Sequence, residues 1–429
     1  MQLSCFQLCL AATFLAGGAF ANDYKARPYH IKAGEAIRVV PVSQLPKSNV
    51  EFDIKLSPYM GASNFITVMR GLEKFDDAVL QKGLQRPNGI GPFLSRFAKQ
   101  ALVYDLLASW FTVAQHEIFG HGYRIRDLGS DVASVIKYRI GLSSGYTQFE
   151  TKPGITPSQN LAITIAGIES NYILARDLKK QWIASSKVYA REGSFYRLNA
   201  LTSLLYSLST DSFTSFSPFQ LQPDHKSSHD LNRYVGLMNI AYPQKQLTRG
   251  RLDALLLLNL FDPMLFFSLA TDFVYLIAAR DAIPIPMIRV KSFKFLPNWR
   301  VELSPFGPEH YLEIFSTFKN RFLYFYGRGG KHGPNSYYGA GLDIRNIAKF
   351  GSLSLAAKLE AWRQPKMALS LYEPVPSSTL LGVLGSLTAN FDMNALGLFI
   401  ELGGKTEGFV PGQSLKDALI FRLGLNVKY

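Results

Sequence analysis

The densest group of chemically reactive side chains lies at residues 115–122, where the sequence reads Gln-His-Glu-Ile-Phe-Gly-His-Gly. Two histidines, His116 and His121, and one glutamate, Glu117, fall within six residues of one another. Imidazole and carboxylate groups are common zinc ligands, and a carboxylate beside a metal can act as a general base. Burying three such groups on an apolar helix is costly unless they share a task, so the cluster predicts a metal site.

This segment resembles the zinc-binding helix of the zincin metallopeptidases, whose pattern is H-E-x-x-H. In that family the two histidines bind zinc, and the glutamate is the general base for a zinc-bound water. The resemblance implies that His116 and His121 are zinc ligands and that Glu117 is the catalytic base. It covers only this segment and, more weakly, the helix around Glu169.

The sequence departs from the zincin pattern by one residue, because it reads H-E-x-x-x-H. On a regular α-helix, positions i and i+5 lie about 140° apart, so His116 and His121 would not share a metal. A π-helical turn at Gly120 would absorb the extra residue, and such turns occur mostly at functional sites. Alternatively, the helix ends at Gly120 and His121 reaches back from the following turn. In a third arrangement the helix stays regular, and Glu117 and His121 bind the metal as an i,i+4 pair.

A third ligand is expected from a later helix. Gluzincin-type peptidases supply a glutamate there, and the resemblance implies Glu169, which lies in an otherwise apolar helical stretch. Gly167 would permit close approach of the two helices. The alternative is that Glu169 forms a salt bridge with Arg124 or Arg126. Asp177, two turns further on, is a candidate to orient a ligand histidine through a hydrogen bond.

A second polar cluster spans residues 224–230 and contains His225 and His229. The two histidines have i,i+4 spacing and could share a metal on a helix. A short polar segment near a helix start favours exposed positions for both. Alternatively, one of them enters the first site, as a fourth ligand or as a donor to a developing oxyanion.

The elements that position these residues follow from the spacing of apolar residues. Residues 93–127 contain no proline and predict one long helix that ends near Gly129. A second helix is predicted at 158–182, opened by Thr156-Pro157-Ser158. Further elements are predicted at 134–149 (a hairpin), at about 196–209 (a helix) and at 263–280 (a helix with Asp262 as N-cap).

From about residue 297 the apolar residues recur with a period of two, which predicts strands. The candidate strands are 299–305, 309–318, 321–328, 336–346, 350–361, 380–391, 395–404 and 418–429. The last one alternates and ends on Tyr429, which resembles the terminal strand of bacterial outer-membrane β-barrel proteins. A further alternating segment at 50–56 is expected to join these strands. The alternative is a soluble periplasmic β-sandwich.

The predicted fold class is α+β. A mainly helical domain with the metal-site helix would cover 22–290, and an antiparallel β-barrel of about eight strands would cover 291–429. No disulfide or thiolate metal site is expected, because the only cysteines, Cys5 and Cys9, lie in the predicted signal peptide.

The first 21 residues predict export from the cytoplasm. They form an apolar stretch that ends in Ala19-Phe20-Ala21, the small-x-small pattern of a signal-peptide cleavage site. No Lys or Arg precedes the stretch, and the alternative is an N-terminal membrane anchor. The expected location is the outer membrane of a Gram-negative bacterium, with the periplasm as the alternative.

The amino-acid composition limits which classes of binding partner are expected. Aromatic residues make up 13% of the chain and charged residues only 18%, which excludes a disordered chain. The net charge of +14 is dispersed, with no basic helix or Lys/Arg block, so nucleic acid is not expected as a partner. Dispersed positive charge suits contact with the anionic lipid of an outer membrane.

These features predict a zinc-dependent hydrolase of the bacterial envelope, a metallopeptidase acting on a peptide or protein substrate. Two other functions stay open. One is a non-catalytic outer-membrane barrel protein (a channel, adhesin or assembly factor) whose histidine cluster is structural. The other is a lipid hydrolase at the membrane surface, with the Phe-rich stretch 261–273 lining an apolar groove.

Overall fold

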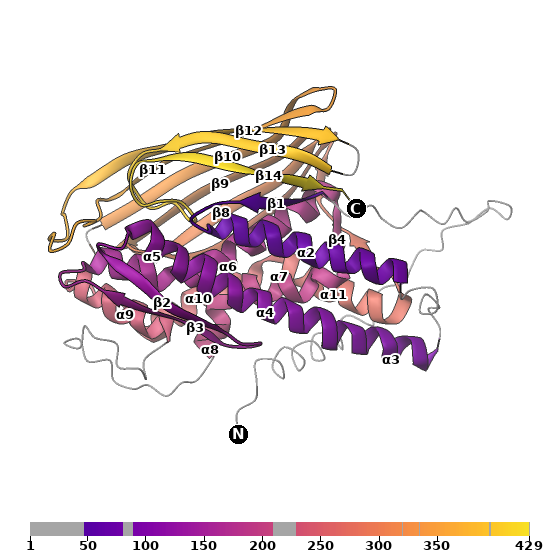
Figure 1. The fold of residues 1–429 in the computed structure, drawn as a ribbon, viewed down its shortest axis with the longest axis horizontal. Coiled ribbons are helices and arrows are strands. Elements are labelled where there is room, and N and C mark those ends of the chain that lie inside the picture. The colour runs from indigo at the N-terminus through magenta and orange to yellow at the C-terminus, as the bar shows by residue number, and fades with distance from the viewer. Residues whose placement is uncertain are drawn as a thin grey trace.

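The computed structural model describes residues 47–79, 89–208, 229–319, 321–333, 335–393 and 396–428. Helices and one large antiparallel sheet make up this part of the chain, which confirms the α+β class (Figure 1). The predicted signal peptide, residues 1–21, lies outside the described residues, as does His225.

The large sheet has ten strands in the order β1-β14-β13-β12-β11-β10-β9-β8-β7-β6. Their bounds are β1 Ser48–Phe52, β6 Ile288–Val290, β7 Phe293–Ser304, β8 Gly307–Phe318, β9 Arg321–His332, β10 Asn335–Phe350, β11 Leu353–Pro365, β12 Thr379–Met393, β13 Leu396–Lys405 and β14 Ala418–Val427. Strands β7 to β14 confirm the eight segments predicted from the period of two. Strand β1 pairs with β14, which confirms that the early alternating segment joins them.

The prediction that these strands close into a barrel is wrong. The end strands β1 and β6 do not pair with each other, and the sheet curves over the helical layer as an open shell (Figure 1). A barrel closes because an open edge leaves backbone groups without hydrogen-bond partners. In this chain side chains of the helical layer bond backbone groups near both edges, on β1 and on the part of β7 that extends beyond β6.

Both edges of the sheet are bonded by an asparagine of the helical layer. At β1, Asn64 of helix α2 (Pro58–Val79) accepts from the backbone N–H of Glu51 at 2.8 Å and donates to its carbonyl at 3.1 Å. At β7, beyond the short strand β6, Asn259 accepts from the N–H of Val301 at 2.6 Å and donates to its carbonyl at 3.0 Å. Each carboxamide thus takes the place of a neighbouring strand.

The helical layer is built from short segments around one long central helix. Its helices are α2 Pro58–Val79, α3 Ile90–Lys99, η2 Gln100–Tyr104, α4 Asp105–His116, η3 Glu117–His121, α5 Gly122–Leu128, α6 Pro157–Ser185, η4 Ala190–Glu192, α7 Gly193–Ala200, α8 Thr202–Leu208, α9 Asp230–Ala241, α10 Arg249–Leu256, η5 Leu257–Phe261 and α11 Pro263–Ala278. Two small antiparallel pairs accompany them, the hairpin of β2 Ala133–Ile140 with β3 Gly145–Thr151 and the pair of β4 Lys187–Tyr189 with β5 Ala282–Pro284.

Several of these helices begin or end at the capping residues that the sequence predicts. The run from α3 to α5 is continuous and stops at Gly129, whose φ of +94° suits a residue without a side chain. Helix α6 starts with a capping box in which Thr156 and Gln159 each bond the other's backbone N–H. Asp262 caps α11 by accepting from the N–H of Met264 at 2.9 Å.

Helix α6 lies between the sheet and the other helices, and most of its 29 residues are buried. One hydrophobic core joins Trp182 of α6 to Phe315 and Tyr324 of the sheet. A second core joins Ile168 of α6 to Tyr234 of α9. Because the sheet and the helices share these cores, α6 fixes the position of every element that reaches the candidate site.

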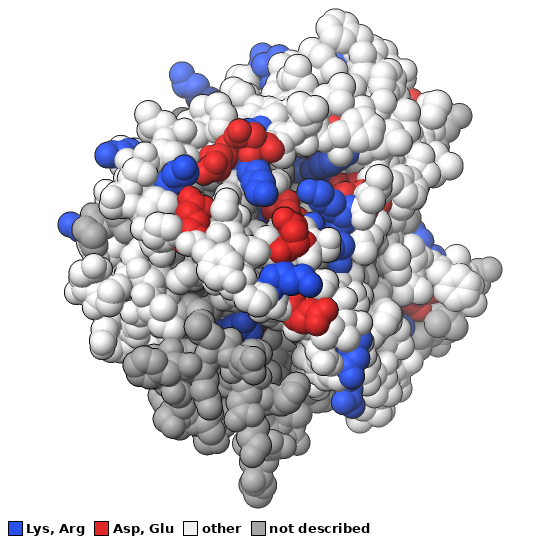
Figure 2. Space-filling model, turned by 60° about the vertical axis from the view of Figure 1, so that its left-hand side comes forward, with Lys and Arg blue, Asp and Glu red and all other residues white. Residues whose placement is uncertain are grey.

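The face of the sheet turned away from the helices is apolar. Its exposed large side chains include Leu312, Phe325, Leu359, Leu381, Val383, Leu387, Leu402, Leu419 and Phe421. On one face of the molecule, acidic and basic side chains gather near the middle (Figure 2). Within the described part of the chain, no single helix has the length and apolar character to cross a membrane, whereas the bent pair Arg249–Phe261 and Pro263–Ala278 meets both criteria.

Candidate metal centre

The two histidines of the cluster meet because one turn of their helix is π-helical. The turn η3 spans Glu117–His121, directly after α4, and the helix continues into α5 without a break. A π turn takes up one extra residue, so the five-residue spacing brings both side chains to one face. The Nε2 atoms of His116 and His121 lie 3.2 Å apart. Of the three arrangements considered from the sequence, the structure adopts the π turn.

The third group of the cluster is Asp230, the first residue of α9. Its Oδ2 atom lies 2.9 Å from Nε2 of His116 and 3.3 Å from Nε2 of His121. With bonds of about 2.0 Å, two ligand atoms of a tetrahedral zinc are roughly 3.3 Å apart. The three side chains therefore present one atom each at the separations that a single zinc ion requires.

Tyr206 of α8 brings a hydroxyl group to the same point. Its oxygen lies 3.1 Å from Nε2 of His116, and its ring stacks on the His116 imidazole with centroids 5.4 Å apart. His229 lies behind Tyr206, where its Nε2 donates to the Tyr206 carbonyl at 2.8 Å. The structure thus offers the Tyr206 hydroxyl, rather than His229, as the fourth group at the cluster.

Backbone and amide groups orient the two imidazoles. Nδ1 of His121 donates to the carbonyl of Ile163 at 2.7 Å, because a carbonyl can only accept. Its Nε2 is then left with a lone pair that faces the other ligand atoms. On His116, Nδ1 lies 3.4 Å from the side-chain amide of Asn171. Both contacts come from α6, so this helix fixes the direction of both rings.

Two glycines allow α6 to approach the π turn. A Cβ atom on Gly167 would lie 2.3 Å from Nε2 of His116, and a Cβ atom on Gly120 would lie 2.6 Å from the carbonyl oxygen of Ala166. Either distance is far inside ordinary contact, so no other residue fits at these positions without movement. Gly167 permits the close helix approach that the sequence predicts.

Without a cation, the cluster holds a proton. Burial lowers the pKa of His121, but the charge and hydrogen bond of Asp230, the charge of Glu117 and the hydrogen bond to the Ile163 carbonyl together outweigh burial and raise this pKa to about 9. Burial raises the pKa of Asp230, yet the two histidines hold it well below its usual range. The metal-free site is therefore an ion pair at neutral pH, and a divalent cation would take the place of the shared proton.

Glu117 lies beside the cluster. Its carboxylate accepts from the hydroxyl of Thr147 on β3 at 2.8 Å, and its negative charge contributes to the raised pKa of His121. The β2–β3 hairpin thus holds Glu117 at the edge of the site. Its carboxylate is therefore close to the cluster without being one of the three converging groups.

The structure does not bring Glu169 into the cluster. Its carboxylate accepts from Nη2 of Arg124 at 3.0 Å and from the backbone N–H of Gly412. The salt bridge with Arg124 was the alternative considered from the sequence. Glu169 is two residues past Gly167, a rotation of about 200° around the helix, so the two positions face opposite sides of α6.

Asp177 does not orient a ligand histidine. It lies ten residues after Gly167, about 15 Å further along the helix axis. There it lines a cavity between α6 and the sheet.

Sequence reasoning does not reach Asp230 or Tyr206. The polar cluster at 224–230 ends on Asp230 and precedes a helix, which is the only feature that points to it. Tyr206 lies on a short helix with no distinguishing pattern. No protein-family model, no curated protein and no solved structure matches this chain, so the candidate metal centre rests on its geometry and chemistry alone.

Proposed function

We propose that this chain is a zinc-dependent hydrolase whose metal ligands are His116, His121 and Asp230. The observation that carries the proposal is the convergence of three ligand atoms, 2.9–3.3 Å apart, at a π turn that two glycines hold against α6. Two imidazoles and one carboxylate are a frequent catalytic zinc set. When bound, zinc supplies Lewis-acid activation of a water molecule.

The residues around the ligands have distinct tasks in this proposal. Glu117 takes a proton from the attacking water and delivers it to the leaving group, and Thr147 orients its carboxylate. The hydroxyl of Tyr206 is placed to donate a hydrogen bond to negative charge that develops at the reacting carbonyl. Peptide bonds are the proposed substrate, because the segment at 116–121 resembles the zincin helix.

One observation favours a lipid substrate as a second candidate. The helical run that leads to the metal centre exposes an apolar stripe, which includes Ile90, Leu94, Leu102 and Trp110. The tip of the β2–β3 hairpin adds Leu142, whose carbonyl accepts from Ser109 of α4. An apolar surface of this kind beside a hydrolytic centre suits a substrate held in a lipid layer.

The proposed location is the bacterial envelope, with the outer face of the sheet lying against outer-membrane lipid. The row of exposed leucine, valine and phenylalanine side chains on this face supports the proposal.

Metal content tests the proposal most directly. Detergent-purified protein should hold about one zinc per chain after reconstitution and dialysis, and both His116→Ala and Asp230→Asn should lose it. His310→Ala is the matched control, because this histidine lies on β8 beside Trp299 and should leave the zinc content unchanged. A wild-type protein that takes up no zinc would refute the proposal.

Catalysis needs a separate test. Glu117→Gln should keep zinc but lose cleavage of casein or of a fluorogenic ester lipid, since the amide cannot take up a proton. Cleavage of casein alone supports the peptidase, and cleavage of the lipid alone supports the second candidate. A zinc-loaded wild type that cleaves neither of them nor any member of a peptide library would leave a structural metal site and overturn the hydrolase.

A further inference from the structure

A second candidate site lies on the other side of α6, between this helix and the concave face of the sheet. The cavity there has a volume of about 380 Å³ and is lined by α2, α6 and inward-facing strand residues. Its wall includes tyrosines of α2 and of β8 and β9, namely Tyr59, Tyr311, Tyr324 and Tyr326. A volume of this size suits a small organic molecule.

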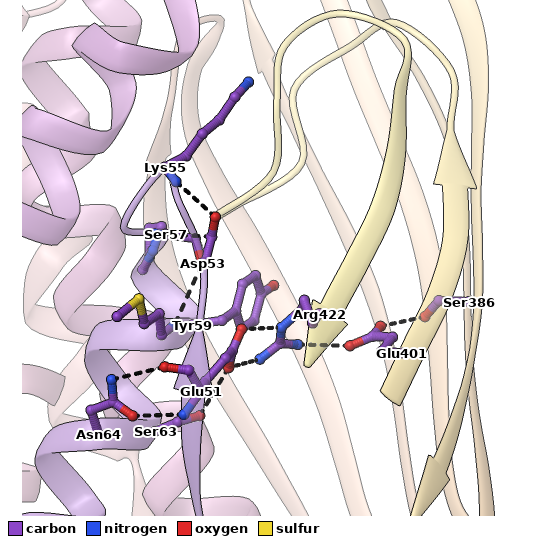
Figure 3. Close-up of polar contacts among 12 residues, drawn as sticks. Glu51, Asp53, Lys55, Ser57, Tyr59, Ser63, Asn64, Ser386, Glu401 and Arg422 are labelled. Atoms are coloured by element: carbon purple, nitrogen blue, oxygen red, sulfur yellow. Dashed lines mark hydrogen bonds and ion pairs between the residues drawn. The ribbon is translucent and has the colours of Figure 1, made fainter. Parts of the chain in front are cut away.

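Most charges on the cavity wall are neutralised by a partner. Arg422 of β14 is bonded by Glu51 and Glu401, and the Tyr59 ring packs against its guanidinium (Figure 3). Lys47 is paired with Asp392. These charges are already paired within the protein and need no ligand in the cavity to neutralise them.

One group on the wall has more cations than carboxylates. Lys180 of α6 donates to Asp343 of β10 at 2.8 Å. Arg176 lies one turn before Lys180 on the same helix, Lys358 is the cross-strand partner of Asp343, and Arg345 is two residues further along β10. The backbone therefore gathers four cations, Arg176, Lys180, Arg345 and Lys358, around Asp343.

The surplus positive charge has no protein partner among the described residues. Arg176, Arg345 and Lys358 make no ion pair with any carboxylate of the described chain, whereas Lys180 uses Asp343. Nζ of Lys358 meets only the Tyr59 hydroxyl, at 3.5 Å, and Arg345 lies over the Phe322 ring. The wall also carries Asp177, which makes no ion pair among the described residues, and Glu360, which is bonded by Arg328. Among the described charges of the wall that lie outside an ion pair, three cations therefore face one carboxylate, and one dianion would offset this surplus of +2.

We propose that this cavity binds a small dianionic molecule, a phosphate monoester or a dicarboxylate, through Arg176, Arg345 and Lys358. A guanidinium group offers two parallel N–H donors to phosphate or carboxylate oxygens, and a lysine adds a point charge. The tyrosine wall would contact the organic part of the ligand. This site is separate from the metal centre, because Arg176 lies nine residues after Gly167 on α6, about 13 Å along its axis.

Isothermal titration of the detergent-purified full chain with glycerol phosphate and with succinate, at constant ionic strength, tests the proposal. The wild type should bind at least one of the two anions saturably, with one site per chain, and the tighter one identifies the anion. Arg176→Gln and Lys358→Met should each weaken binding at least 10-fold. The matched control is Arg363→Gln, which removes an exposed cation from the outer face of the same strand as Lys358 and should bind as the wild type does.

Three outcomes would overturn the proposal. They are no saturable binding of either anion to the wild type, equal weakening in Arg176→Gln and Arg363→Gln, and unchanged binding in both cavity variants. Arg176→Lys keeps the charge but loses the two-pronged donor, so it serves if Arg176→Gln does not fold, and it too should bind more weakly. Asp230→Asn should leave anion binding intact, which separates failure of this site from failure of the metal centre.

Discussion

Gly167→Ala is the sharpest test of how α6 and the π turn build the metal centre. The new Cβ atom would lie 2.3 Å from Nε2 of His116 and 2.5 Å from two ring carbons, whereas ordinary contact begins at 3.4 Å. The imidazole must therefore retreat by about 1.1 Å, which is about five times the tolerance of roughly 0.2 Å for a zinc–ligand bond.

The expected result is a loss of zinc affinity with a modest change in stability. We expect zinc to bind about 100-fold more weakly, at the upper end of what indirect changes at metal sites cause. Overpacking should cost about 1–3 kcal/mol, and the better helix propensity of alanine should return about 1 kcal/mol.

Gly71→Ala is the matched control, because Gly71 lies on α2 and a Cβ atom there meets nothing within 4 Å. It should stabilise the protein by about 1 kcal/mol and leave zinc binding unchanged. Competition with a chromophoric chelator measures the zinc affinity, and urea unfolding measures the stability. If Gly167→Ala binds zinc as tightly as Gly71→Ala does, the packing of His116 against α6 is not what positions this ligand.

Three further changes address other parts of the structure. Glu169→Gln should keep zinc but destabilise the protein by about 1–3 kcal/mol in urea unfolding, because Arg124 loses a buried charged partner. Loss of zinc in this variant would show that Glu169 is a metal ligand. In metal-free protein, the charged form of His121 stabilises the fold fully below pH 6.5, its ordinary pKa, and this contribution is lost as the pH rises through about 9. The free energy of unfolding in EDTA should therefore fall by on the order of 3 kcal/mol across that interval, and a variant His121→Gln with the same slope would contradict the assignment. Asn64→Leu should lower the free energy of unfolding by roughly 2–4 kcal/mol, measured by heat or urea, and promote aggregation, because two backbone groups of Glu51 lose their partner. A soluble variant of wild-type stability would show that the β1 edge needs no side-chain partner.

The alternation of apolar residues is enough to predict the strands, because every strand of this sheet has one face toward the helices and one face outward. It does not predict whether the sheet closes. Closure depends on which groups form hydrogen bonds with the edge strands, and here Asn64 and Asn259 bond backbone groups near the two edges. Neither asparagine differs in sequence from one that is exposed on a helix, so their role appears only in three dimensions.

The candidate metal centre, too, could be predicted only in part from the sequence. If His116 and His121 share a metal, their spacing requires either a π turn or a helix end at Gly120, and the structure has the π turn. The third ligand depends on which side of α6 faces the turn, and one residue of rotation changes the answer by about 100°. Glu169 therefore faces Arg124, while Asp230 arrives 109 residues after His121 along the chain.

The pairing of β1 with β14 joins the earliest described strand to the latest one, with Ser48 opposite Val427 and Phe52 opposite Leu423. During synthesis β1 is made before every other strand of this sheet and β14 after all of them, so this edge stays open until the last of these strands has been made. Contacts of such long sequence separation form slowly, and open strands invite pairing with other chains. A chain that stops before β14 would carry two open edges, at β1 and at β13, and would be a target for aggregation or proteolysis rather than a smaller folded protein.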